Sequence, residues 1–239
     1  TALVTWGASG IGKAVSSMYA AKGAKVAVVD VNGDAAAAHA RTLKNGAQAF
    51  QCDVSDAALV ERTSKDVASA LGGIDILVNC AGVVFLAPAE DLDESDWDKT
   101  IDINLKGTFL MCQSVGRQMI AGSGGKIINM ASQAGSVAID QHAAYCASKF
   151  GVIGLSKVFA AEWGKHGITV NTISPTVVLT ELGRKAWGGP KGDALIAQIP
   201  TGRFAEPEEI AAAAVFLGSN GAEMINGADL LIDGGYTIT

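Results

Sequence analysis

The stretch ALVTWGASGIG (residues 2–12) decides the fold of this chain. Its first four residues form a short apolar run, which is typical of a strand buried in a parallel sheet. Three glycines lie in the next seven residues, and helical spacing of apolar residues begins at Ile11. The stretch therefore predicts a strand, a glycine-rich turn and a helix in direct succession.

The same alternation of strand and helix continues along the chain. Short apolar runs predict strands at residues 2–5, 25–30, 47–52, 74–79, 126–131, 168–173 and 228–232. Helical spacing separates them at residues 11–22, 34–44, 57–71, 97–121, 143–166 and 207–217. Short buried strands joined by amphipathic helices form a parallel sheet with helices on both faces. We therefore predict an α/β fold, a Rossmann-type doubly wound sheet of about seven strands, in a single domain over residues 1–239.

The composition restricts the partners of the protein. Hydrophobic residues make up 49% of the chain and charged residues 18%, which is ample for a core covered on both sides. The net charge is −6, the pI is near 5.0 and no basic run occurs, so we expect neither nucleic acid nor an anionic membrane surface as a partner. No apolar run approaches the roughly 20 residues of a membrane helix. A small-molecule substrate is the better expectation.

The cysteines and histidines indicate neither disulfides nor a metal. Cys52, Cys80, Cys112 and Cys146 lie far apart and form no Cys-x-x-Cys pair. They are typical of reduced thiols in a reducing compartment, and no signal-peptide pattern is visible, so we predict a cytoplasmic protein. The three histidines are scattered, so we predict no metal site.

The glycine-rich turn predicts a dinucleotide site. Glycines between a strand and a helix let the backbone approach a pyrophosphate at the helix N-terminus, here through Ser9, Gly10, Ile11 and Gly12. Asp30 lies 20 residues beyond Gly10 at the end of the second expected strand, where a carboxylate can accept hydrogen bonds from the adenosine ribose. It would repel a 2′-phosphate and no arginine is adjacent, so we predict NAD rather than NADP. The alternative for Asp30 is a plain turn residue at a strand end.

A second candidate site follows the fifth expected strand. Tyr145 and Lys149 are four residues apart and share a face of the expected helix. A phenol titrates near ~10, and a close ammonium favours the phenolate, so such a tyrosine can exchange a proton with an alcohol. Ser132, at the carboxyl end of the strand, could offer a hydroxyl to the same oxygen. Tyr-x-x-x-Lys alone is a weak signal, and the alternative is a half-buried tyrosine beside a solvated lysine.

Taken jointly, these motifs resemble the short-chain dehydrogenase/reductase family over essentially the whole chain. The shared features, in the family's order, are the glycine turn, Cys52-Asp53-Val54, Asn79-Cys80-Ala81-Gly82, Asn104, Ser132, Tyr145-x-x-x-Lys149 and Pro175 to Thr180. The resemblance implies that Asp53 and Val54 flank adenine. It also implies that the run from Asn79 through Ala81 to Gly82 lines the dinucleotide groove. Val178 and Thr180 would hold the nicotinamide amide, with Pro175 also at the cofactor.

The resemblance implies a reaction as well, a hydride transfer between a carbinol carbon and the nicotinamide. Tyr145 would act as general base in oxidation and as general acid in reduction. Lys149 would lower the pKa of Tyr145 and hold the nicotinamide ribose, and Ser132 would orient the substrate oxygen. Asn104 would hold a water in a proton relay to the lysine. The alternative for Asn104 is a helical asparagine that hydrogen-bonds a neighbouring carbonyl.

Within the family, the chain is similar to the xylulose reductase and sugar-alcohol (polyol) dehydrogenase branch. The residues that carry this similarity are Ser132-Gln133, His142, Tyr145-Cys146, Pro175-Thr176-Val177-Val178, Thr180, Trp187, Ile199-Pro200 and Phe204-Ala205-Glu206. It implies that Gln133 and His142 contact the hydroxyls of a polyol, beside an apolar wall of Ile139 and Trp187. The alternatives are a solvent-facing His142 at the start of its helix and a Trp187 that packs within a flap.

The glycine- and proline-broken segment 180–204 predicts a mobile substrate lid, with a disordered surface loop as the alternative.

Two residues depart from the family pattern. Trp6 stands at the first glycine of the turn, where either the turn shifts and Gly7 supplies the freedom, or NAD binding is weakened. Thr176 follows Pro175 where the family often has glycine, a milder departure.

Three functions follow from these observations. The favoured one is an NAD-dependent dehydrogenase of a polyol or another secondary alcohol, with an alcohol/ketone pair as its small-molecule substrate. The alternatives are a 3-oxoacyl thioester (acyl-carrier-protein) reductase and a non-catalytic dinucleotide-binding regulator. By resemblance we also expect a homo-oligomer, a tetramer that pairs the helices at 97–121 and 143–166.

Overall fold

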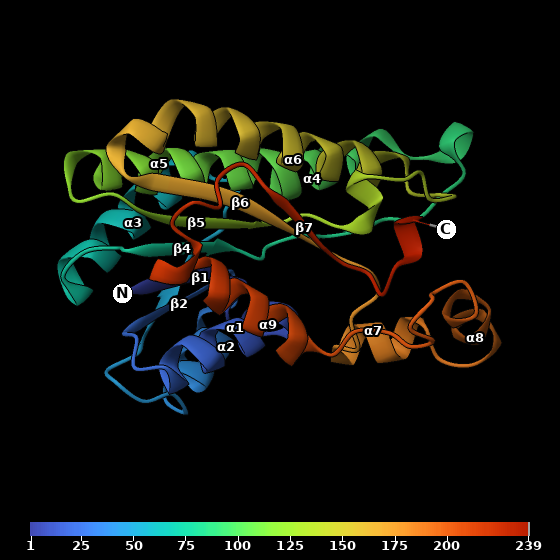
Figure 1. Ribbon diagram of the computed structural model, residues 1–239, viewed down its shortest axis with the longest axis horizontal. Helices are drawn as coiled ribbons and strands as arrows, with labels where there is room; N and C mark the ends of the chain where they lie inside the picture. Colours follow the sequence, from blue (N-terminus) through green and yellow to red (C-terminus); the bar gives the residue numbers. More distant parts are fainter. Residues whose placement is uncertain (239) are drawn as a thin grey trace.

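A seven-stranded parallel sheet lies at the centre of the computed structural model, which describes residues 1–238 (Figure 1). Its strands run in the order β3-β2-β1-β4-β5-β6-β7. Their bounds are β1 Ala2–Thr5, β2 Val26–Asp30, β3 Gln48–Gln51, β4 Ile76–Asn79, β5 Gly125–Met130, β6 Ile168–Pro175 and β7 Asp229–Ile232. All seven predicted strands and the predicted doubly wound α/β fold are confirmed. The strand order reverses between β1 and β4, and a crevice at the carboxyl ends is expected there.

The central strands are apolar because both of their faces are covered. Val4 in β1 pairs with Val28 in β2 and with Val78 in β4, and all three are fully buried. Two hydrophobic clusters, one on each face, are separated by the sheet. Burial on both faces explains why the strands lack alternating polar residues.

Helices cover both faces of the sheet (Figure 1). One layer contains α1 Gly10–Ala21, α2 Gly33–Ala40 and α9 Pro207–Leu217, and the other contains α3 Ala57–Leu71, α5 Gly107–Ala121 and α6 Ala143–Trp163. Short 3-10 turns lie at Ala89–Asp91, Gln133–Gly135, Gly164–His166, Asn220–Ala222 and Tyr236–Ile238. Among the described residues, no helix has both the length and the apolar character needed to cross a bilayer.

Two helices differ from their prediction. The helix expected at 97–121 begins earlier, as α4 Glu94–Ile101, and passes through a π-helical turn, Asp102–Lys106, into α5. The helix expected at 34–44 ends at Ala40, because the Thr42 hydroxyl bonds the carbonyl of His39 and the chain then reverses through Asn45, which has a positive φ. Neither the extra π-turn residue nor this local capping has a periodic signal in the sequence.

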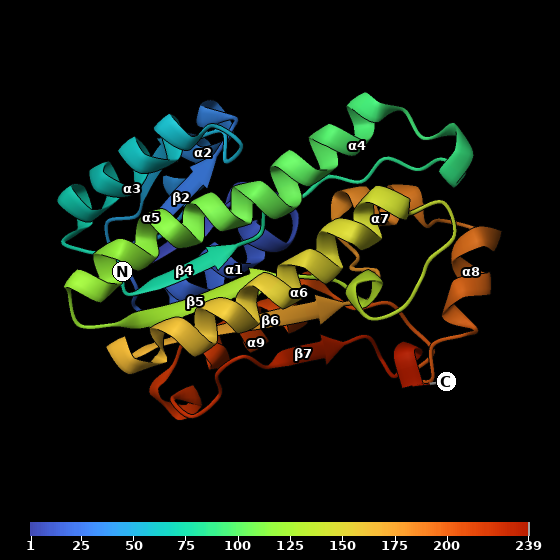
Figure 2. The ribbon, with the colours of Figure 1, turned by 90° about the horizontal axis from the view of Figure 1, so that it is seen from above.

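The segment 180–204 is folded and not a disordered loop. It contains the short helices α7 Glu181–Ala186 and α8 Pro190–Ile196. Figure 2 shows both helices beyond the carboxyl ends of β6 and β7, on the same side of the molecule as the loop that precedes α6. The segment therefore stands next to the edge of the sheet where a ligand is expected.

Candidate active site

The expected crevice at the carboxyl ends of β1 and β4 is bordered by a hydroxyl that the sequence did not single out. The buried Thr5 Oγ1 accepts hydrogen bonds from the backbone N–H groups of Cys80, at 3.0 Å, and Ala81, at 3.2 Å. These bonds fix the end of β1 to the start of the loop after β4. The predicted groove residue Ala81 thus uses its amide within the protein.

The glycine turn presents a helix N-terminus to this crevice. The side chain of Ser9, the N-cap of α1, makes no capping hydrogen bond, and the first turn of α1 has no acidic residue. In contrast, Asn32 and Asp56 cap α2 and α3 with their side chains. The exposed Ser9 and Gly10 therefore leave first-turn N–H groups available to an anion, which fits the predicted pyrophosphate contact.

Asp30 lies at the end of β2 beside the same turn. Its carboxylate is 5% exposed and accepts hydrogen bonds from the N–H of Ala8, at 3.3 Å, and the N–H of Asn32, at 3.0 Å. These two amides orient the carboxylate at the edge of the crevice. The arrangement fits an acceptor for ribose hydroxyls, as predicted.

Three of the predicted cofactor residues have clear structural roles of their own. Asp53 accepts hydrogen bonds from the N–H and the hydroxyl of Ser55, and Val54 packs against Gly107, where an added Cβ would lie 2.7 Å from Val54 Cγ2. The Asn79 amide points into the interior and donates to Asn129 Oδ1 at 2.8 Å. The side chain of Asn79 therefore belongs to the packing between β4 and β5 and does not face the groove.

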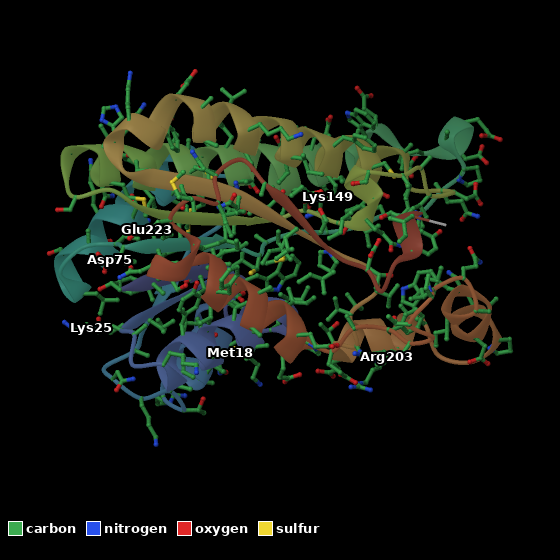
Figure 3. All side chains as sticks on the ribbon, in the orientation of Figure 1. Met18, Lys25, Asp75, Lys149, Arg203 and Glu223 are labelled. Carbon is green, nitrogen blue, oxygen red and sulfur yellow. The ribbon has the colours of Figure 1, made fainter. Side chains whose placement is uncertain are left out.

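Ser132, Tyr145 and Lys149 come together between β5 and α6. Figure 3 labels Lys149. The Lys149 Nζ donates to the carbonyl of Met130 at 2.7 Å and lies 5.5 Å from the centroid of the Tyr145 ring. Lys149 is 4% exposed, so it is not the solvated lysine of the alternative interpretation. The Ser132 side chain lies close enough to the Tyr145 phenol to affect its pKa, and its Oγ accepts from the N–H of Ala134 at 3.2 Å.

Burial controls the charges of this group. Desolvation raises the pKa of Tyr145 above its usual value, and the Ser132 side chain offsets only part of that rise. Desolvation also lowers the pKa of Lys149 to about 8, partly offset by the nearby Cys80. The expected net lowering of the Tyr145 pKa is therefore wrong for this structure, because the cost of burying the phenolate exceeds the favourable contacts.

Asn104 lies in the π-helical turn between α4 and α5 and is fully buried. Its Oδ1 accepts from the N–H of Val83 at 2.7 Å, and its Nδ2 donates to the carbonyl of Val83 at 2.9 Å and to the Ser148 hydroxyl at 3.1 Å. Gly82 lies against both the Asn104 amide and the Lys149 amine. The bond to the Val83 carbonyl agrees with the alternative interpretation of Asn104, and the residue also connects the β4 loop to α6. π-turns are frequent at functional sites.

Of the predicted substrate residues, His142 contacts the Tyr145 ring. Gln133 is 5% exposed, and its Oε1 has no hydrogen-bond partner among the described residues. The His142 ring lies edge-on to the Tyr145 ring at a centroid distance of 6.0 Å, and its Nδ1 is 2.6 Å from the carbonyl of Asp140. The carbonyl of the partly buried Ile139 accepts from the N–H of His142.

Trp187 contacts its own segment. Its ring packs edge-on against Phe204, at 6.3 Å between centroids, and Lys191 Nζ lies 4.6 Å from its centroid. These contacts agree with the packing alternative for Trp187.

Thr180 lies against Gly10 of the glycine turn. A Cβ on Gly10 would lie 3.4 Å from the Thr180 methyl group, while the Thr180 hydroxyl caps α7 by accepting from the N–H of Gly183. Val178, near Pro175 at the end of β6, forms an isolated bridge with Ala205. The start of the 180–204 segment therefore lies beside the glycine turn.

A family model described as "Enoyl-(Acyl carrier protein) reductase" matches residues 7–237. The chain belongs to the short-chain dehydrogenase/reductase family. Short-chain dehydrogenases bind a nicotinamide dinucleotide, and the glycine turn and Asp30 described above are the parts of this chain that fit one.

Members of this family resemble the chain over nearly its full length. It is 65% identical over 240 residues to the D-threitol dehydrogenase of Mycolicibacterium smegmatis, covering 99% of this chain and 92% of that protein. It is 50% identical over 237 residues to the NAD-dependent glycerol dehydrogenase of Listeria innocua, covering 99% and 93%. The crystal structure of gox2181 superposes with a TM-score of 0.97 at 36% identity and covers 100% of this chain and 95% of that one.

Two contributors to this short-chain dehydrogenase site were not predicted. One is the Thr5 hydroxyl, and the other is Thr176, whose buried Oγ1 has no hydrogen-bond partner within residues 1–238. The signal for Thr5 was its place as the last residue of β1, directly before the turn. The sequence marks Thr176 as a departure from glycine and as part of the polyol-branch similarity, but its unpaired hydroxyl depends on how the ends of β6 and β7 pack.

Proposed function

We propose that this protein is an NAD-dependent polyol dehydrogenase, which interconverts a polyol and the corresponding ketone by hydride transfer. One observation carries the proposal: the Gln133 Oε1 is buried without a donor, in the residue next to Ser132, whose side chain lowers the pKa of Tyr145. A buried carbonyl oxygen without a donor costs free energy, and a hydroxyl next to the reacting carbinol would supply that donor. The relatives named as threitol and glycerol dehydrogenases support the same substrate class.

The chain's own residues would handle the proton. The bound nicotinamide supplies the hydride acceptor in oxidation and the hydride donor in reduction. Tyr145 takes the hydroxyl proton of the alcohol in oxidation and returns it to the carbonyl oxygen in reduction. Ser132 donates to the same oxygen as negative charge develops on it. The Lys149 ammonium, held by the Met130 carbonyl, favours the phenolate while it stays protonated.

Asp30 supports NAD over NADP. Its carboxylate is held at the end of β2 by the N–H groups of Ala8 and Asn32, where it can accept hydrogen bonds from ribose hydroxyls. The same charge would repel a 2′-phosphate. The relative named as an NAD-dependent glycerol dehydrogenase is consistent with this choice.

We infer that residues 180–204 form the substrate lid. Thr180 at its start lies against Gly10 of the glycine turn, so the segment borders the expected cofactor crevice. Leu195 and Ile196 of α8 are only partly buried. A ligand in the crevice would cover these apolar side chains, and closure of the segment would exclude water from the reacting atoms.

The test is to mix the protein with NAD and, separately, with NADP, and to add glycerol and four- to six-carbon polyols while following absorbance of the reduced cofactor. We expect turnover with NAD and at least one polyol. Activity confined to NADPH and a 3-oxoacyl thioester would contradict the proposal. Measurable NAD binding without turnover of any alcohol or carbonyl would instead favour a regulator.

Tyr145→Phe is the matched variant for this test, because it removes only the phenolic hydroxyl. We expect kcat to fall by about 10²–10⁴-fold, the usual contribution of a positioned acid–base group. The NAD dissociation constant, measured by calorimetry, should stay within about twofold, since factors this small lie below ~0.5 kcal/mol. Substantial residual turnover by this variant would count against the role of Tyr145.

A further inference from the structure

Trp6 has a backbone conformation that its side chain disfavours. Its φ is +51°, in the left-handed region where a Cβ crowds the following carbonyl oxygen. The other non-glycine residues with positive φ among residues 1–238 are Asn45 and Gln141. Asparagine tolerates this region because its short polar side chain bonds locally, whereas an indole gains no such bond. Trp6 is therefore a strained position in the turn that faces the crevice.

The turn cannot relax around Trp6, because the backbone is held on both sides. Thr5 pairs with Val29 in β2, and the N–H of Gly7 donates to the Val29 carbonyl at 3.0 Å. The Trp6 carbonyl is packed against Gly12, where an added Cβ would lie 2.2 Å from that oxygen. Gly7 does not have a positive φ, so it does not absorb the strain, and the first of the two alternatives raised by the sequence is wrong.

The two hydrophobic clusters of residues 1–238 do not take up the indole of Trp6. The Thr5 side chain is turned to the loop after β4, and Gly7 faces the strand, where a Cβ would meet the Val4 carbonyl at 2.9 Å. The Trp6 carbonyl faces α1. The Trp6 side chain is partly buried, yet it belongs to neither of the two hydrophobic clusters that the described residues form. What remains for it is the opening between the N-terminus of α1 and the end of β4.

We propose that Trp6 sets the dinucleotide affinity of this protein, because its indole occupies part of the space beside the N-terminus of α1 that the cofactor pyrophosphate needs. The inference rests on the proposed NAD site. A bound dinucleotide must displace the ring, and the fixed backbone of the turn allows the ring to move only by rotation of the side chain. The wild-type protein therefore binds NAD more weakly than the rest of its site would allow.

The experiment compares the wild type with Trp6→Gly and Trp6→Ala by calorimetric titration of NAD and by thermal melting without cofactor. Both variants remove the ring, so both should bind NAD at least about tenfold more tightly, equivalent to ~1.4 kcal/mol. Only glycine also relieves the φ strain, so Trp6→Gly should melt about 2 °C higher than Trp6→Ala. Asn45→Gly is the matched control: it relieves a positive φ in an exposed turn far along the chain and should leave the NAD dissociation constant unchanged.

Each outcome decides between the inference and the proposed function. Equal NAD dissociation constants in the wild type and both variants would overturn the inference and leave the dehydrogenase intact. Tighter binding by Trp6→Gly alone would assign the effect to the backbone and overturn the role of the indole. Weaker binding by both variants would show that the ring contacts the cofactor favourably. If no protein, Trp6→Gly included, bound NAD or NADP, both the inference and the proposed cofactor would fail.

Discussion

Lys149 is buried and Tyr145 is half-buried at the point where the reaction needs charge. Burial penalises the phenolate and the ammonium alike, so the pKa of Tyr145 is raised and that of Lys149 is lowered to about 8. The Ser132 side chain lowers the pKa of Tyr145 and the nearby Cys80 raises that of Lys149, so each recovers part of this cost. At neutral pH Tyr145 is consequently a protonated phenol and not a phenolate.

The raised pKa of Tyr145 predicts opposite pH dependences for the two directions. Oxidation needs the phenolate, so kcat/KM for polyol oxidation should rise between about pH 7 and 9.5, with a slope near 1 on a logarithmic scale. Above pH 8 the rise should become less steep, because Lys149 loses its proton and no longer favours the phenolate. Ketone reduction uses the protonated phenol and should not rise over that range. Initial rates in both directions provide the measurement, and a flat oxidation profile would contradict the assignment.

Lys149 predicts a conflict between stability and function. Its pKa is lowered from 10.5 to about 8 in the folded state. Between these two pH values the unfolded chain therefore binds more protons than the folded chain. The free-energy cost of burying the charged amine is fully present below pH 8. Lys149→Met should remove that cost and lose one hydrogen bond, for a net gain on the order of 2 kcal/mol at pH 7. Urea unfolding should show this gain shrinking as the pH rises from 8 towards 9.5. A variant less stable than the wild type at pH 7 would refute the prediction, and turnover should be lost in either case.

At the scale of elements, the π-turn between α4 and α5 brings three segments together. It places the Asn104 side chain where its amide bonds both the backbone of Val83 and the hydroxyl of Ser148. This one side chain therefore connects the loop after β4, the π-turn before α5, and α6. A regular helix would rotate Asn104 away from this position, because the π-turn adds one residue to the turn. The position of α6, which carries Tyr145 and Lys149, depends on this contact.

Asn104→Ala should therefore affect stability and activity together. The change leaves the partly buried N–H and carbonyl of Val83 without partners and empties the fully buried site of the amide, and we expect a loss of about 2–4 kcal/mol in the free energy of unfolding. The exposed Asn220→Ala is the control and should change stability by less than about 0.5 kcal/mol. Urea titrations with kcat measured on the same preparations would check both effects. A stable Asn104→Ala variant would show that the amide is not structural.

The elements also show where sequence reasoning works and where it stops. The strands and most helices were predictable because burial on both faces of β1 or on one face of α3 leaves a pattern in the residues themselves. The grouping of Ser132, Tyr145 and Lys149 followed from the order of strands and loops. The π-turn, the Thr5 hydroxyl and the direction of the Tyr145 pKa were not predictable, since each depends on contacts between segments far apart in the chain.

At the scale of the molecule, the sheet separates the rigid and the adjustable parts of the site. The glycine turn, Asp30 and the residues on α6 are fixed by strands and long helices, whereas α7 and α8 lie beyond the sheet (Figures 1 and 2). The ion pair between Arg184 and Glu206, at 2.8 Å, connects α7 to the start of α9 on the surface. Exposed Trp97, Phe150 and Val158 lie on the helices where the sequence predicts contact with other copies, and the homo-oligomer stays a prediction.

Closure of the proposed lid should be visible as protection from protease. Arg184, Lys185 and Lys191 are exposed on α7 and α8, two short helices with few buried side chains, so local opening there is expected to need little free energy. NAD together with a polyol should slow tryptic cleavage at these three sites at least about fivefold, equivalent to ~1 kcal/mol of added local stability. Cleavage at Arg41, in the exposed turn after α2, is the internal control and should keep its rate. Mass spectrometry of timed digests resolves the cleavage sites. Closure of residues 180–204 shields only the backbone of that segment. Equal slowing of cleavage at Arg41 would therefore assign the protection to global stabilisation of the protein.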